Sequence, residues 1–140
     1  MPSTIIPCLR YRRAVEAIDF LCKAFDFQAH AVFRHAHDDS VVEHAQLTYG
    51  GGMVMLGSVR EDTPFARHMV QPDEVMGRET QCACVTVTGD LRAHYERAKA
   101  AGALIVEEYA EKHQGGAGYA ARDPEGHLWY FGTYDPWADA

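Results

Sequence analysis

Hydrophobic and polar residues alternate along the chain with two different periods. Over residues 14–25 the apolar side chains recur every three to four positions, which predicts a helix with one buried stripe. The same spacing returns over residues 91–101, where Gly102 has the backbone freedom to end the helix. Shorter segments of alternating or mixed polarity predict strands at residues 5–11, 27–35, 41–49, 53–57, 82–88, 104–109, 118–122 and 127–133.

The predicted elements occur twice in the same order. A strand, a helix and three strands are followed by a second such set, and a shift of 76 residues aligns Leu9 with Val85 and Ala17 with Ala93. The sequence therefore predicts an α+β fold of two tandem βαβββ modules. We expect a single domain over residues 1–140, with module one at about 4–57, a linker at 58–80 and module two at about 81–134.

Each module has one helix, enough to cover one face of its four strands. The strand alternation places Phe27, Phe33, Leu47 and Trp129 beneath the helices. The opposite faces are half apolar and contain few Lys and Glu residues, which favours a concave ligand-binding surface over an ordinary solvated face. The residues expected on this surface are Ile6, Arg10, His30, His44, Gln46, Thr48, Met53, Met55, Cys82, Thr86 and Tyr130.

Composition and charge limit the classes of partner that we expect the chain to bind. Thirteen Lys and Arg residues against twenty Asp and Glu residues give a net charge of -7, which disfavours nucleic acid and favours cationic ligands. No apolar run approaches the ~20 residues that span a bilayer, and the N-terminus lacks the pattern of a signal peptide, so we expect no membrane partner. The four cysteines form no CxxC pair, and we expect reduced thiols in a cytoplasmic protein.

The end of the second module carries a family resemblance. The duplicated βαβββ pattern, the helix start at residues 14–20 and the segment Asp123-Pro124-Glu125-Gly126-His127-Leu128-Trp129-Tyr130-Phe131 resemble the vicinal oxygen chelate superfamily. This superfamily contains glyoxalase I, extradiol dioxygenases, fosfomycin-resistance enzymes and bleomycin-resistance proteins. The resemblance covers about residues 5–134 and implies a mixed sheet curled around a cup, with helices on the outer face, in a homodimer.

The resemblance also implies where a metal ion would be held. Its ligand positions correspond to Ile6 and Met55 in the first module and to Cys82 and Tyr130 in the second. A hydrocarbon, a thioether, a thiol and a phenol are not the imidazole and carboxylate set that such a site needs. We therefore expect no metal and no other cofactor.

Without the metal, the resemblance implies binding of a small organic molecule in the cup rather than catalysis. Antibiotic or toxin sequestration of the bleomycin-resistance type is the specific form of this hypothesis, and no catalytic residue is assigned. Arg10 is suited either to a ligand carboxylate or phosphate or to a structural surface role. Two enzyme alternatives stay open: a metal-dependent glyoxalase, lyase or dioxygenase with non-standard ligands such as His30, His44 and Cys82, and a metal-free enzyme that uses His44 or Tyr130.

Overall fold

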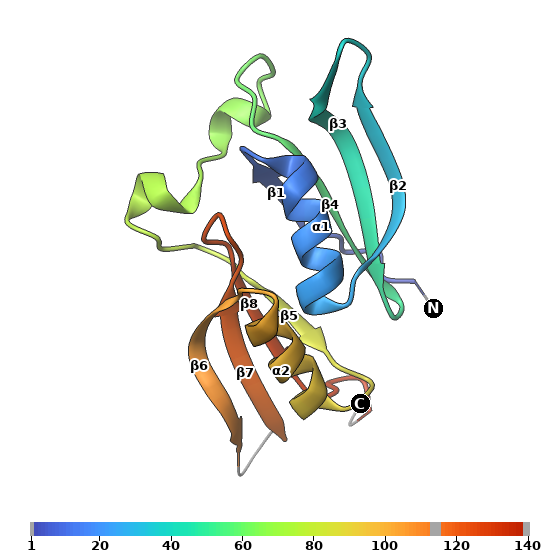
Figure 1. Ribbon diagram of the computed structural model, residues 1–140, viewed down its shortest axis with the longest axis vertical. Helices are drawn as coiled ribbons and strands as arrows, with labels where there is room; N and C mark the ends of the chain where they lie inside the picture. Colours follow the sequence, from blue (N-terminus) through green and yellow to red (C-terminus); the bar gives the residue numbers. More distant parts are fainter. Residues whose placement is uncertain (1, 113–115, 139–140) are drawn as a thin grey trace.

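The computed structural model describes residues 2–112 and 116–138, and in it the chain forms two four-stranded sheets with one helix each (Figure 1). The first module consists of β1 (Cys8–Tyr11), α1 (Ala14–Phe25), β2 (Gln28–His35), β3 (Asp38–Tyr49) and β4 (Gly52–Ser58). The second consists of β5 (Ala83–Thr86), α2 (Leu91–Ala100), β6 (Leu104–Glu111), β7 (Ala117–Arg122) and β8 (Leu128–Gly132). Between them the chain forms two short 3-10 helices, η1 (Ala66–His68) and η2 (Pro72–Val75).

Both sheets have the same topology. Their strand orders are β1-β4-β3-β2 and β5-β8-β7-β6, so that the first strand of each module lies at the edge of its sheet. That edge strand is parallel to its neighbour, and the remaining pairs are antiparallel. The predicted α+β fold of two repeated modules is confirmed, with two mixed sheets that do not close on each other. No helix in the described part of the chain is long and apolar enough to cross a membrane.

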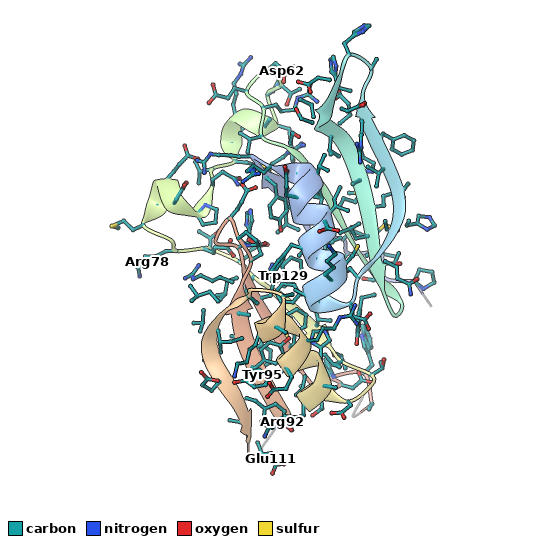
Figure 2. All side chains as sticks on the ribbon, viewed as in Figure 1. Asp62, Arg78, Arg92, Tyr95, Glu111 and Trp129 are labelled. Carbon is teal, nitrogen blue, oxygen red and sulfur yellow. The ribbon has the colours of Figure 1, made fainter. Side chains whose placement is uncertain are left out.

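The helix-covered sides of the two modules share one core. Phe25 at the end of α1 lies 4.6 Å, between ring centroids, from Phe131 of β8, and Phe27 lies 5.5 Å from Trp129. Helix α1 also packs against α2, and Figure 2 shows Trp129 between the two modules. As predicted, Phe27, Leu47 and Trp129 are buried. Because the covered sides pack together, the opposite face of each sheet, here called its open face, has no helix over it.

The sheet face predicted for Phe33 was wrong. The register between β2 and β3 shifts between Ala29 and Ala31, so that His30 is an extra residue without a partner on β3. A residue inserted in this way reverses the alternation of all that follow. Phe33 consequently pairs with His44 on the open face, instead of lying beneath the helix, and its side chain is 58% exposed.

The turn between β7 and β8 joins the two modules. The Asp123 carboxylate accepts hydrogen bonds from the Tyr11 hydroxyl at 2.6 Å and from the Trp129 indole at 3.1 Å. The Glu125 carboxylate accepts from the backbone N–H groups of Arg12 at 2.6 Å and Arg13 at 2.8 Å, at the start of α1. The segment that carries the family resemblance therefore joins the two modules. We call Asp123 and Glu125, with these four hydrogen bonds, the clasp.

Candidate functional site

The open face of the first sheet carries most of the predicted site residues. The strand register sets Gln46 beside Met55 and Thr48 beside Met53, and the four side chains are half-buried. The amide of Gln46 lies 3.1 Å from Nε2 of His44, which brings a polar pair into the same face. The face therefore combines thioether groups with a small number of hydrogen-bonding groups, as ligand pockets do.

Arg10 occupies the same open face at the sheet edge. It lies beside Gly57 in the parallel pairing of β1 with β4, and its side chain is half-buried. A Cβ atom placed on Gly57 would lie 2.5 Å from Nη1 of Arg10, so the guanidinium crosses the glycine closely. Because residue 57 has no side chain, the guanidinium can take this position across β4.

The open face of the second sheet is built around Tyr130. This residue pairs with Cys84 of β5 and Ala120 of β7. A Cβ atom on Gly118 would overlap the Tyr130 hydroxyl, so the hydroxyl end of the Tyr130 side chain occupies the space that a side chain at residue 118 would fill. The ammonium of Lys112 lies 5.1 Å from the ring centroid, and hydrogen bonding to Tyr130 raises the pKa of Lys112. Thr86 shares this face but donates its hydroxyl to the backbone oxygen of Tyr134.

A cavity of about 780 Å³ brings together three of the predicted residues. It is lined by Ile6, which precedes β1, by Arg10 within β1, and by Cys82, which precedes β5. The linker side chains of Phe65 and Val70 add to its apolar wall. The predicted residues farther along the strands do not line this cavity, and His30 is exposed on the β2 bulge. One chain thus presents two open faces and an edge cavity rather than one closed cup.

The four family metal positions do not suit a divalent ion. Ile6 and Met55 belong to the first module and Cys82 and Tyr130 to the second, and together they supply no imidazole and no carboxylate. Among residues 2–112 and 116–138, no group of three or more His, Cys, Asp or Glu side chains converges as metal ligands would. His30, His44 and Cys82 therefore do not assemble into the alternative ligand set. We derive no chemistry through a metal at these positions.

The chain as a whole is negatively charged, but the strand positions of its open faces are not. In the register of β1, β4, β5, β7 and β8, the open-face positions carry two arginines, Arg10 and Arg122, and no carboxylate. The carboxylate of Glu107, opposite Ala120 on β6, lies 3.6 Å from Lys112. Six acidic residues lie on β3 and β6, and the other acidic residues in the described part of the chain lie on the helices, the linker, the turns and the C-terminal segment. A cationic ligand is therefore not what these strand positions favour.

Two buried histidines lie away from the open faces. His94 of α2 contacts the Tyr119 hydroxyl at 2.6 Å and the Phe25 backbone oxygen at 3.0 Å, and burial lowers its pKa. His127 donates to the Arg10 backbone oxygen at 2.8 Å and contacts Glu79 at 3.0 Å. Burial opposes a charge on His127, but the bond to Glu79 and the charge of Asp123 outweigh it, so that the pKa of His127 is raised.

Comparison with known proteins agrees with this architecture. A family model described as Glyoxalase/Bleomycin resistance protein/Dioxygenase superfamily matches residues 6–131. The chain belongs to this superfamily. The predicted resemblance to the vicinal oxygen chelate superfamily is thereby confirmed.

Solved structures with the same fold extend the comparison. TioX from Micromonospora sp. ML1 is 31% identical and has a TM-score of 0.68, with 92% of this chain and 94% of that chain covered. The fosfomycin resistance protein FosX from Listeria monocytogenes is 13% identical over 94% of this chain and 93% of that chain, with a TM-score of 0.63. UcmS2 is 16% identical and has a TM-score of 0.69, with 95% of this chain and 99% of that chain covered. No curated protein matches the chain.

Sequence reasoning missed several open-face residues. Phe33 was assigned to the wrong face, since nothing in the residues around His30 signals a bulge. Gly57 and Gly118 looked like ordinary strand glycines, although their missing side chains make room for Arg10 and Tyr130. The glycines were the available signal, because a glycine inside a strand indicates a close approach by another group.

Proposed function

We propose that the chain binds a small, partly aromatic organic molecule without a metal ion, and sequesters it rather than transforming it. The observation that carries this proposal is the chemistry of the open faces at the family metal positions. Met55 and Tyr130 offer soft, polarisable and aromatic contact there, and they replace the ligands that metal-dependent relatives would need.

The binding groove requires a second copy of the chain. Each chain leaves both open faces uncovered, and β1 and β5 are edge strands with one free side. Ile5, Phe65 and Val70 are 83%, 63% and 57% exposed, respectively, around the edge cavity, an apolar surface typical of an interface. We propose a homodimer in which the first module of one copy and the second module of the other enclose each ligand.

Resistance to a toxic compound is the biological role that this proposal favours. FosX from Listeria monocytogenes is a fosfomycin resistance protein, and it shares the fold of this chain. A protein that holds a small toxic molecule in a groove protects by stoichiometric capture, which requires tight binding but no catalytic group. The proposal accordingly assigns contact roles, and no catalytic role, to His44 and Tyr130.

Titration calorimetry against a panel of aromatic antibiotics, with and without EDTA, tests this function. We expect at least one compound to bind with the same affinity in both conditions, and elemental analysis to find no stoichiometric metal. Affinities no tighter than about millimolar, or about -4 kcal/mol, across the panel would contradict the proposal. Binding that EDTA abolishes would support the metal-dependent alternative instead.

A further inference from the structure

We propose that Arg10 is the anchor for an acidic group of the ligand, so that the ligand is an aromatic molecule with a carboxylate or a similar planar oxyanion. This inference rests on the proposed function and specifies the chemistry of its ligand. A guanidinium presents parallel N–H donors that match the two oxygens of a carboxylate.

The Arg10 side chain has no acceptor of its own in the described part of the chain. It makes no hydrogen bond and no ion pair with residues 2–112 or 116–138, although it is half-buried. Arg12, Arg60 and Arg97 have carboxylate partners in Asp73, Asp62 and Asp26. Arg34, Arg78 and Arg92 have no ion pair within the described residues, but they are exposed to water. The Arg10 guanidinium stays accessible to water, because no buried side-chain nitrogen or oxygen among the described residues lacks a partner, and a ligand oxyanion would supply charged acceptors in place of that water.

The backbone around Arg10 is nevertheless firmly placed. Its carbonyl oxygen accepts from Nε2 of His127 at 2.8 Å, and its strand is paired with β4 through Gly57. The side chain then crosses Gly57 at the distance described above, where any larger residue would push the guanidinium away. The chain thus combines a fixed backbone with a space kept clear for the cation.

An aromatic surface lies on the same face, across the sheet from Arg10. Phe33 pairs with His44, and their rings are stacked with centroids 6.2 Å apart and planes inclined by 21°. The strand order places Arg10, Gly57, His44 and Phe33 on successive strands β1, β4, β3 and β2. Four adjacent strands span about 14 Å between the outer two. Because the guanidinium already reaches over Gly57, the remaining length suits a fused bicyclic ring with an acidic substituent.

The equivalent place in the second module cannot bind an anion in this way. Thr86, 76 residues after Arg10, has its hydroxyl bonded to the Tyr134 backbone oxygen. The other cations near that face have protein contacts: Arg122 donates to the Gly126 backbone oxygen at 2.7 Å, and Lys112 lies 3.6 Å from the Glu107 carboxylate. Among the described open-face residues, Arg10 is therefore the cation without a protein partner, and it would orient an acidic ligand in one direction in a groove formed from one first module and one second module.

A matched pair of probes tests the anchor: 2-naphthoate and its uncharged analogue 2-naphthamide. Calorimetry on the full chain at neutral pH should show tighter binding of the carboxylate, by about tenfold or more. Arg10→Gln should abolish that preference and leave the affinity for the amide unchanged. Arg34→Gln, which removes the same charge from an exposed position on β2, should leave the preference intact. Arg10→Lys, which keeps the charge without the planar fork, should give an intermediate preference.

The outcomes separate the anchor from the proposed function. If neither naphthalene probe binds, the proposed aromatic site itself is contradicted. If both bind equally to the unmodified protein, the site stands and the anchor is wrong. If the preference for the carboxylate survives in a folded Arg10→Gln variant, checked by thermal unfolding, another group binds the oxyanion and the assignment to Arg10 is overturned.

Discussion

The open faces of the two modules differ far more than their cores. At positions 76 or 75 residues apart, Arg10 corresponds to Thr86 and Met55 to Tyr130, so a cation is exchanged for a hydroxyl and a thioether for a phenol. The covered positions keep their apolar character, because they must pack against a helix in both modules. The duplication thus separates what the fold requires from what the ligand requires: the core is repeated, and the open faces carry the specificity.

The turns before the last strand of each module also differ. In the first module this turn contains Gly50 and Gly51 and is exposed. In the second it contains Asp123 and Glu125, which bond to β1 and α1 of the first module. The second module therefore supplies the clasp that holds the two halves together, whereas the first supplies the proposed anchor for the ligand.

Removing the clasp is expected to have the largest effect. Asp123→Ala leaves the Tyr11 hydroxyl and the Trp129 indole as buried donors without their acceptor, which should lower the free energy of unfolding by about 3 kcal/mol. Urea denaturation followed by tryptophan fluorescence measures this loss. Asp39→Ala, which truncates an exposed carboxylate at the start of β3, should change the free energy of unfolding by no more than about 0.5 kcal/mol. Equal losses for the two variants would show that the Asp123 hydrogen bonds do not hold the modules together.

Truncating Tyr130, the aromatic residue on the open face of the second sheet, is expected to weaken ligand binding without unfolding the protein. Tyr130→Ala should reduce the binding free energy of 2-naphthoate by about 1–3 kcal/mol, the range of a buried aromatic anchor. Tyr134→Ala, which removes a tyrosine that is 51% exposed beyond β8, is the matched control and should have little effect. Calorimetry that finds an unchanged affinity for Tyr130→Ala would remove the second open face from the site.

The two buried histidines predict opposite pH dependences of stability. The raised pKa of His127 means that the folded state holds this proton more tightly, so its contribution is lost as the pH rises through that pKa. The lowered pKa of His94 means that its contribution is lost as the pH falls below the ordinary histidine value.

Unfolding curves between pH 5 and pH 9, with His127→Gln and His94→Gln as variants, separate the two histidines. His127→Gln should reduce only the decline in the free energy of unfolding at alkaline pH. His94→Gln should reduce only the decline in the free energy of unfolding at acidic pH. A decline at alkaline pH that persists unchanged in His127→Gln would show that the clasp does not depend on a protonated histidine.

Much of the fold was predictable because its determinants are local. The helix periodicity, the strand alternation and the repeat offset each follow from short stretches, and they predicted the α+β modules and the burial of Leu47 and Trp129. The face of Phe33 was not predictable, because one inserted residue in β2 reverses the alternation without a distinct sequence signal. The joining of the modules through Asp123 and Tyr11 depends on contacts between residues 112 positions apart, which no periodicity reports.

The central claim is that two copies of the chain together bind an organic ligand without a metal ion, and native mass spectrometry of EDTA-treated protein with 2-naphthoate tests it most directly. We expect a complex whose mass corresponds to two chains and two ligand molecules, with no bound metal ion. A monomer that binds the ligand alone, or a dimer that binds it only when a divalent ion is restored, would contradict the claim.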